Sequence, residues 1–328
     1  MHHDWLDSAA ARPRYRPECP LLWRGLDRVQ LGEGRRHVLI QASPLLTRWI
    51  EGLTGLRTVN ELFIDLDVIG LDQDIAMQTL RTCAAAGAID DAASMPNSWR
   101  HFDSAARRQS EPDHTAALLT YGHSAIAHSL IDQRHQTTAC VTSSLDQRSD
   151  PHLTNSIHHA LSAAGLTVTE DTNGPDLTVI VGSHPVIGSE ISALDIPTLT
   201  SAHLFVASYG DRAIAGPLVI PGNTSCLRCA YLHTRDADHQ WAGVSVQLTS
   251  AIARLRQLPV DRLLATLIAG QVGRLARAWA DRTIVQTQWQ NIAFELRLPE
   301  CEVTVQPRPS HPLCQCRWTT QGDLAPQT

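Results

Sequence analysis

Apolar residues in the first third of the chain follow a strand-like pattern and then a helix-like one. Apolar runs on either side of residues 32–34 predict two strands joined by a glycine turn. Three helices should follow, the first capped by Ser43 with Pro44 at its first position, and the third closed by Gly87. These elements predict a winged-helix-like domain over residues 18–92. The expected strands are 21–31 and 37–41, and the expected helices are 43–52, 59–66 and 72–86.

From residue 114 onward, strands alternate with helices. Residues 1–17 look like a loose arm, and the polar stretch 93–113 looks like an irregular linker. The alternation is typical of a mostly parallel α/β sheet, so a second domain is expected over residues 114–318. Its expected strands are 116–121, 137–142, 177–181, 204–208, 214–220, 284–289, 293–298 and 302–306, and its expected helices are 125–133, 155–164, 246–258 and 260–280.

Composition and charge exclude several classes of protein. The formal net charge is −6 and no long basic run occurs, which argues against a nucleic-acid partner. The longest apolar helical stretch, 260–280, contains three arginines, which argues against a membrane span. No secretory signal is visible, so a cytoplasmic location is expected. All 27 basic residues are arginine, which excludes any mechanism that needs a lysine ammonium.

Four of the eight cysteines form two close pairs, Cys226 with Cys229 and Cys314 with Cys316. In a reducing compartment such pairs suggest a metal before a disulfide. Four thiolates around one zinc ion leave no open position, so the sequence predicts a structural zinc site. The alternatives are four unrelated buried cysteines or a redox pair. Two nearby histidines, His233 and His311, are alternative ligands.

A nucleotide site is the other candidate. Residues 120–125 lie where a strand is expected to turn into a helix. They keep one of the three glycines of the nucleotide-binding loop, Gly122, followed by Ser124. No acid for a ribose occurs before Asp146, so a strand–turn–helix without ligand is favoured and ATP and Mg²⁺ are doubtful cofactors. Asp236 and its neighbours could bind Mg²⁺ or a partner, although a solvated loop is the default interpretation. No Ser-His-Asp arrangement is evident.

Three segments resemble one known family. Residues 216–229, with the motif Gly-Pro-Leu-Val-Ile-Pro-Gly-Asn-Thr-Ser-Cys-Leu-Arg-Cys, and residues 311–316, with His-Pro-Leu-Cys-Gln-Cys, are similar to E1-like, ThiF-related proteins. These are the cyclodehydratase C components of thiazole/oxazole-modified peptide and bacteriocin biosynthesis. Residues 53–62 resemble the family's N-terminal peptide clamp, a winged-helix RiPP recognition element.

The resemblance implies a peptide-binding role. Family members bind a precursor's leader peptide along a strand and the third helix of the clamp, which correspond to residues 37–41 and 72–86 here. They present the peptide to a partner YcaO enzyme, which uses the ATP. Their Cys₄ zinc corresponds to the four paired cysteines. The sequence leaves open whether the chain is a monomer or a homodimer.

The preferred hypothesis is therefore a non-catalytic, zinc-containing E1-like scaffold that binds a precursor peptide. The alternative is an ATP-dependent ThiF-like adenylyltransferase acting on a peptide or carrier-protein terminus. Adenylating relatives use a complete glycine loop, a lysine and acids, and this sequence lacks the loop, the acid and every lysine. Without those groups the charge of a reacting phosphate would be poorly stabilised.

Overall fold

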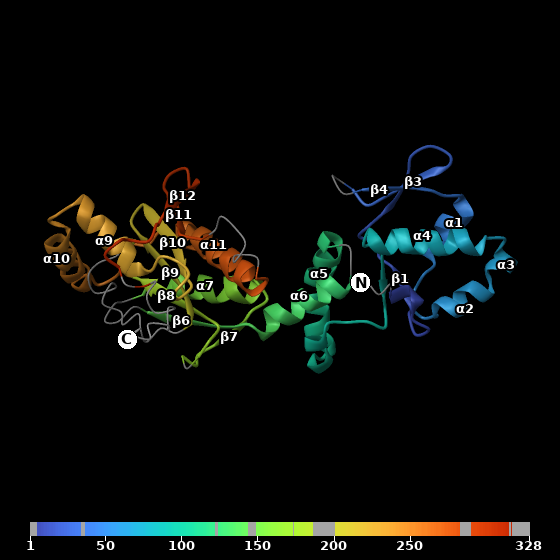
Figure 1. Ribbon diagram of the computed structural model, residues 1–328, viewed down its shortest axis with the longest axis horizontal. Helices are drawn as coiled ribbons and strands as arrows, with labels where there is room; N and C mark the ends of the chain where they lie inside the picture. Colours follow the sequence, from blue (N-terminus) through green and yellow to red (C-terminus); the bar gives the residue numbers. More distant parts are fainter. Residues whose placement is uncertain are drawn as a thin grey trace, which may run out of the picture. The chain divides into compact units, whose positions relative to one another are not determined.

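The computed structural model describes residues 5–33, 37–121, 124–143, 149–172, 174–185, 201–282, 290–314 and 316. The chain divides into two compact units, Met1–Asp132 and Gln133–Thr328 (Figure 1). Each unit has its own hydrophobic core. The division lies beyond the linker that was predicted at 93–113.

Unit 1 contains a three-stranded antiparallel sheet in the order β2-β3-β4. The strands are β2 (Leu21–Trp23), β3 (Arg28–Leu31) and β4 (Val38–Gln41). The single strand predicted at 21–31 is therefore wrong. It is interrupted by a hairpin in which Gly25 adopts a φ of 98°, a conformation that glycine reaches without strain.

Four helices follow this sheet, and their starts are set by local capping. They are α1 (Pro44–Glu51), α2 (Val59–Ile64), α3 (Leu66–Ile69) and α4 (Gln73–Ala85). Ser43 caps α1 by accepting from the Leu46 amide, and Asp72 caps α4 in the same way. The predicted helices at 43–52, 59–66 and 72–86 are confirmed within about two residues. The winged-helix assignment stays a prediction.

The N-terminal segment is ordered into unit 1, and the predicted loose arm is wrong for its described residues. Strand β1 (Pro13–Tyr15) pairs antiparallel with β5 (Ile89–Asp91). Arg16 is buried and its Nη1 lies 2.7 Å from Oδ2 of Asp90, which is also buried. Because a buried charge needs a partner, this ion pair holds the segment against strand β5.

Residues 93–121 are largely helical. A 3₁₀ turn, η3 (Asn97–His101), precedes α5 (Ser104–Tyr121), and α6 is Ser124–Gln136. The irregular linker is therefore wrong from residue 104 onward, and the strand predicted at 116–121 is the last part of a helix. Ala117 and Leu118 are buried on that helix, so the apolar run forms the buried face of a helix and not a strand.

Unit 2 is built on a seven-stranded sheet in the order β12-β11-β10-β9-β8-β6-β7. Strands β7, β6, β8 and β9 are mutually parallel, whereas β9, β10, β11 and β12 pair antiparallel. The sheet is thus mixed, and the expectation of a mostly parallel sheet is corrected. The strands are β6 (Thr138–Ser143), β7 (Thr167–Thr169), β8 (Leu177–Gly182), β9 (Ala202–Tyr209), β10 (Arg212–Val219), β11 (Ile292–Arg297) and β12 (Val303–Pro307).

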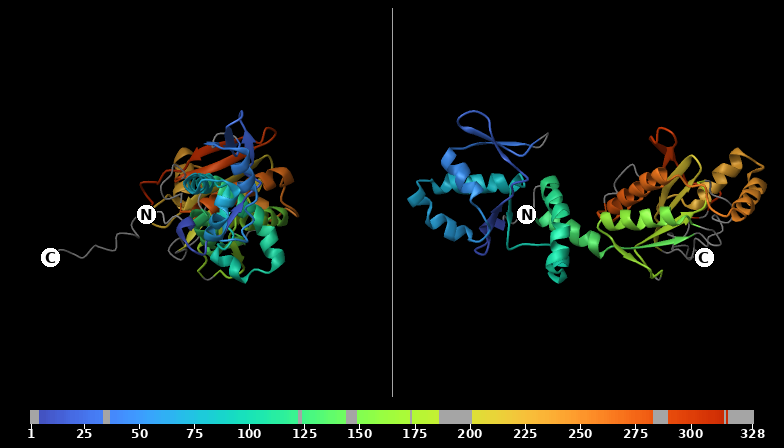
Figure 2. Two further views of the ribbon diagram at one scale, coloured as in Figure 1. Left: turned by 90° about the vertical axis from the view of Figure 1, so that its right-hand side faces the viewer. Right: turned by 180° about the vertical axis from the view of Figure 1, so that it is seen from behind.

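Helices cover both faces of this sheet. On one face α7 (Pro151–Ala163) and α11 (Arg262–Ala280) pack side by side over the main core (Figure 2). Their approach is close, because a Cβ placed on Gly273 of α11 would lie 2.7 Å from the Ala160 carbonyl oxygen. On the other face α9 (Leu227–Ala237) packs through Leu227 against a smaller cluster, and α10 (Trp241–Ala253) follows it.

The remaining predictions for unit 2 have mixed outcomes. The strands expected at 137–142, 177–181, 204–208, 214–220, 293–298 and 302–306 are present, with shifts of up to two residues. The strand expected at 284–289 lies outside the described residues. Helix α9 was not anticipated, although it begins directly after Cys226 and contains Cys229. Within the described residues, no helix has the length and apolar character needed to cross a bilayer.

Candidate functional site

Four cysteine side chains of unit 2 converge at the N-terminal end of α9. Cys226 is the cap residue of this helix and Cys229 lies in its first turn, while Cys314 and Cys316 come from the C-terminal segment. The four Sγ atoms all lie within 4.8 Å of one another. Measured separations are 3.8 Å for Cys226–Cys229, and 3.5 Å for Cys226–Cys314 and for Cys229–Cys316.

The loop before α9 fixes the first cysteine pair. The Thr224 hydroxyl accepts a hydrogen bond from the Ile220 amide at 2.8 Å and donates to the Leu218 carbonyl at 3.2 Å. Gly222 adopts a φ of 79°, which gives this loop its tight turn. The Ser225 amide donates to the Asn291 side chain at 2.6 Å, so the loop is also attached to the segment just before β11. Contacts within the loop and one distant side chain, Asn291, therefore determine where Cys226 lies.

The cluster has the geometry of a tetrahedral thiolate site. Zinc–sulfur bonds of about 2.3 Å in a tetrahedron place the sulfurs roughly 3.8 Å apart, close to the measured separations. All four cysteines are free thiols rather than disulfides. A hydrogen bond from Cys226 lowers the pKa of Cys229 to about 4, while the same bond raises the pKa of Cys226. Because neighbouring thiolates repel one another, a cation in the centre would stabilise the fully ionised set, and the cluster could hold a metal ion.

The two nearby histidines have other roles. His311 Nε2 donates to Asp236 at 2.8 Å, and its Nδ1 accepts from the Leu313 amide. His233 Nε2 lies 3.1 Å from the Pro309 carbonyl, and the two imidazole rings are in edge contact at 4.7 Å. These contacts connect α9 to the segment that carries Cys314. Neither histidine belongs to the metal-binding group, and Asp236 pairs with His311 and Arg235.

The structure does not place the predicted nucleotide loop at the end of a strand. Residues 116–121 belong to α5, and Ser124 is the first residue of α6, so a helix lies on each side. Gly122 lies outside the described residues. A phosphate-binding cradle requires a strand that delivers the loop to a helix N-terminus, and this segment lacks the strand. The premise of that prediction was therefore wrong.

In unit 2, the first strand that leads through a loop into a helix is β6, which is followed by α7. Strand β6 lies where the strand order reverses, between β7 and β8, which is the position at which open α/β sheets bind ligands. The N-terminus of α7 is already occupied: Asp150 accepts from the Leu153 amide at 3.0 Å, and Pro151 supplies no amide at all. A carboxylate at this helix end would repel a phosphate. Sequence reasoning missed this cap.

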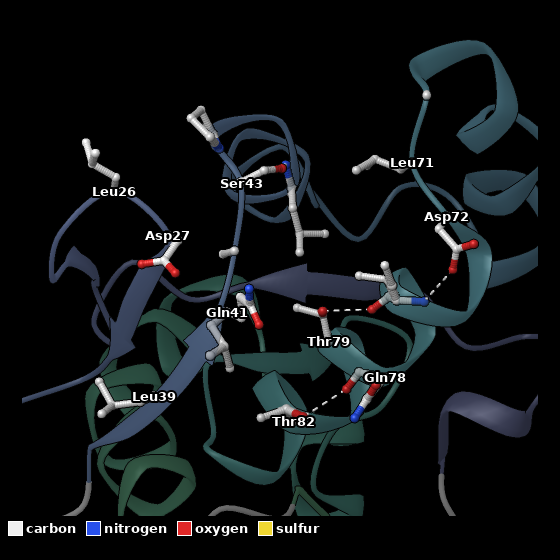
Figure 3. A pocket seen from close by; sticks show the side chains of 16 residues that line it. Leu26, Asp27, Leu39, Gln41, Ser43, Leu71, Asp72, Gln78, Thr79 and Thr82 are labelled. Carbon is white, nitrogen blue, oxygen red and sulfur yellow. Dashed lines mark hydrogen bonds between the residues drawn. The ribbon is translucent and has the colours of Figure 1, made fainter.

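Unit 1 contains a groove between the free edge of β4 and helix α4 (Figure 3). Its volume is about 880 Å³, near the upper end of ligand-site volumes. In Figure 3 Gln41 of β4 and Gln78, Thr79 and Thr82 of α4 line this space. The complete lining is Leu26, Asp27, Leu39, Ile40, Gln41, Ala42, Ser43, Pro44, Leu46, Gly70, Leu71, Asp72, Ile75, Gln78, Thr79 and Thr82.

The strand that lines this groove has backbone groups available for pairing. Ala42 donates its amide to the Asp27 carbonyl of the β3 side, in the register that pairs Gln41 with Arg28. Because successive residues of an antiparallel strand point their amides to opposite sides, Leu39 and Gln41 direct N–H and C=O toward the outer edge. Strand β4 is the last strand of its sheet among the described residues. An extended segment could pair there.

The groove is lined by polar and apolar surface in similar measure. Leu39 of the strand and Ile75 of the helix both line the groove, with 48% and 54% of their surfaces exposed, and Leu26 is almost fully exposed. The charged residues of the lining are Asp27 and Asp72. Exposed leucine and isoleucine beside a free strand edge are typical of a surface that binds a partner. Sequence analysis identified both walls but missed Leu26 and Asp27, which lie in the unexpected hairpin.

Comparisons with known proteins identify the fold. No protein-family model matches the chain, and no curated protein matches it by sequence. Solved structures do match: the heterocyclase TruD with 17% identity and a TM-score of 0.60, and a heterocyclase in complex with substrate and cofactor with 14% identity and a TM-score of 0.62. Escherichia coli MccB bound to MccA matches with 11% identity and a TM-score of 0.52.

Coverage differs between these structures. Each match spans 93% of this chain, including both units. The matched region is 42% of TruD and 39% of the other heterocyclase chain, but 99% of MccB. This chain therefore corresponds to about two fifths of the heterocyclase chains and to nearly all of MccB. At such low identity the likeness establishes the fold alone.

Proposed function

We propose that this protein is a non-catalytic E1-like scaffold that binds the leader of a ribosomal precursor peptide. It presents the peptide to a partner YcaO-type cyclodehydratase, which forms the thiazole or oxazole rings of a bacteriocin-like product. The groove between β4 and α4 carries the proposal, because it places an unpaired strand edge beside a helix face that exposes Ile75 among polar side chains. Sequence reasoning placed the leader on the same two elements.

The structural matches support a peptide substrate. The matched structures include MccB together with MccA and a heterocyclase together with its substrate. In each case the match covers 93% of this chain, so the groove-bearing unit is part of the shared fold and not an addition. The leader would add a strand to β4 through Leu39 and Gln41 and place apolar side chains against Ile75.

The groove also indicates what kind of leader it binds. Its lining combines apolar residues such as Leu39 and Ile75 with polar ones, and Asp27 and Asp72 are its charged residues. A segment with alternate large apolar residues would fill the floor, since alternate side chains of a strand face one side. A lysine or arginine near either end of that segment would meet a carboxylate. Acidic residues at those positions would be repelled.

The proposed role for unit 2 is structural rather than adenylating. The Asp150 cap at the N-terminus of α7 places a negative charge where a nucleotide phosphate would bind. The four clustered cysteines would hold one structural zinc ion, because their number and spacing suit tetrahedral thiolate ligation and leave no open position. That ion would join the C-terminal segment to α9.

Leader binding is tested with the full-length protein and fluorescein-labelled synthetic peptides. The probes are the leader halves of short precursor-like peptides encoded beside the gene, and the measurement is fluorescence anisotropy. Ile75→Arg places a charge in the groove and should weaken binding by at least about tenfold. Val68→Arg is the matched control, since Val68 is 88% exposed on α3 and does not line the groove. Equal affinity of both variants for the peptide would refute the groove as the binding site.

The adenylyltransferase alternative predicts a different result. Mg-ATP titrated calorimetrically into metal-loaded protein should then bind in the micromolar range, and Asp150→Asn should strengthen that binding. We expect no detectable heat from the wild type. Micromolar ATP binding would replace the scaffold function with the adenylating one.

A further inference from the structure

The C-terminal segment that carries Cys314 is attached to one face of helix α9. Cys229, His233 and Asp236 are spaced four and three residues apart, so they lie along the same face of this helix. Cys229 belongs to the metal-binding cluster, whereas the other two side chains contact residues 309–313. One helix face therefore carries a metal ligand in its first turn and two further contacts beyond it.

The contact at Asp236 involves a buried imidazole whose two nitrogens are both used. The Leu313 amide donates to Nδ1 of His311 at 3.1 Å, and this bond requires a ring nitrogen without a proton. Nε2 therefore carries the proton and donates to Asp236 at 2.8 Å. Only 4% of the His311 side chain is exposed, so burial and two hydrogen bonds hold the ring in one orientation.

The backbone of His311 connects this ring to both cysteine pairs. Its carbonyl accepts from the Cys314 amide at 2.9 Å, which closes a turn directly before the second pair. Its amide donates to the sulfur of Cys229 in the first pair. Amide hydrogen bonds stabilise a thiolate, so a correctly placed His311 also favours the form of Cys229 that binds metal.

His233 makes a second attachment from the same helix face. Its Nε2 lies 3.1 Å from the Pro309 carbonyl oxygen, to which it can only donate. Its ring is in edge contact with the His311 ring, with the centroids 4.7 Å apart. The segment is thus held at residues 309 and 311 by contacts that need no metal ion.

We propose that His233 and Asp236 are positioning residues of the zinc site, which hold the C-terminal segment on α9 before the metal binds. This inference rests on the zinc ion proposed for unit 2. In many small metal-binding domains the site forms only with the metal, which then supplies the folding free energy. Here the contacts at residues 309 and 311 place Cys314 beside α9 independently of the metal. The zinc dissociation constant should therefore depend on two side chains that are not ligands.

The test measures the zinc dissociation constant of the full-length, reduced protein by competition with a coloured chelator. His233→Ala and Asp236→Ala should each raise this constant by about 10- to 100-fold, as the loss of an outer-shell contact typically does. Asp238→Ala is the matched control, because its carboxylate accepts from the Gln240 amide at 2.9 Å and not from the C-terminal segment. Asp236→Asn keeps an oxygen that accepts from His311 and should bind zinc like the wild type.

Hydrogen exchange of the metal-free protein tests whether the segment is held before zinc binds. The Leu313 and Cys314 amides should be protected in the wild type without zinc. The double variant His233→Ala/Asp236→Ala should lose this protection until zinc is added. Its α11 amides should exchange as in the wild type, which a general loss of stability would not allow.

Three results would overturn the proposal. They are full exchange of both amides in the metal-free wild type, equal zinc affinity of Asp236→Ala and Asp238→Ala, and weak zinc binding by Asp236→Asn. A wild type that takes up no zinc would overturn it together with the zinc site of unit 2. Leader-peptide anisotropy separates this inference from the scaffold function, since a wild type that binds zinc but no leader would refute the scaffold function alone.

Discussion

Two glycines on one turn of α11 should respond oppositely to the same substitution. A Cβ on Gly270 meets no atom within 4 Å, so Gly270→Ala should stabilise the protein by up to about 1 kcal/mol through helix propensity. A Cβ on Gly273 would lie 2.7 Å from the Ala160 carbonyl oxygen, a backbone atom that cannot turn aside. Overpacking of this kind costs about 1–3 kcal/mol, which outweighs the same propensity gain.

We therefore expect Gly273→Ala to be less stable than Gly270→Ala by about 1–3 kcal/mol. Chemical unfolding of the full-length variants gives the difference, and hydrogen exchange of the α11 amides assigns it to unit 2. Separation of α7 from α11 should also weaken the hydrogen bonds from Arg277 to the Ala163 and Ala164 carbonyls. Equal stability of the two variants would refute the close approach of these helices.

Three other perturbations test single features. Asp281→Asn removes the carboxylate that lies 2.7 Å from Nε of the buried Arg134 and should cost about 3–5 kcal/mol in urea unfolding. Burial lowers the pKa of His114 to about 4, so the unfolded chain binds this proton more readily, and stability should fall as pH drops from 6.5 toward 4. His114→Gln should flatten that urea-midpoint profile. Zinc present at 1,000 times its dissociation constant should raise the free energy of unfolding by about 4 kcal/mol, and a chelator should remove that gain in calorimetric unfolding. The control Cys301→Ser should retain the metal.

Elements governed by neighbouring residues were predictable from the sequence. Ser43 and Asp72 cap their helices through a side chain and an amide three residues later, so the signal is contained in a few positions. The buried strand β8 was found because every residue in it is apolar or small. The spacing of the cysteines indicated their shared chemistry, because few arrangements other than a metal site use four thiols in two close pairs.

Elements decided by distant contacts were not predictable. The apolar run at 116–121 suits a strand or a buried helix, and Pro112 suggested a break, yet the structure places this proline inside α5. The N-terminal arm is ordered because β1 pairs with β5, far along the chain. The direction of the last three sheet strands depends on neighbours that no local pattern reveals.

The groove shows the same division between local and distant information. Both walls were expected, since strand and helix patterns are local. Its outline was not, because Leu26 and Asp27 reach it from a hairpin that splits a predicted strand. A binding surface assembled from several segments becomes visible only when their packing is known.

The Asp150 cap has a practical consequence for work with mixtures of proteins. Under the proposed scaffold function, turnover of ATP in a reaction reconstituted from this protein, a precursor and a partner enzyme would be assigned to the partner. Labels or inhibitors that compete for an adenine nucleotide would then report on that enzyme and leave this chain untouched. Peptide binding by this protein and ATP hydrolysis by the partner could thus be measured independently in one reaction mixture.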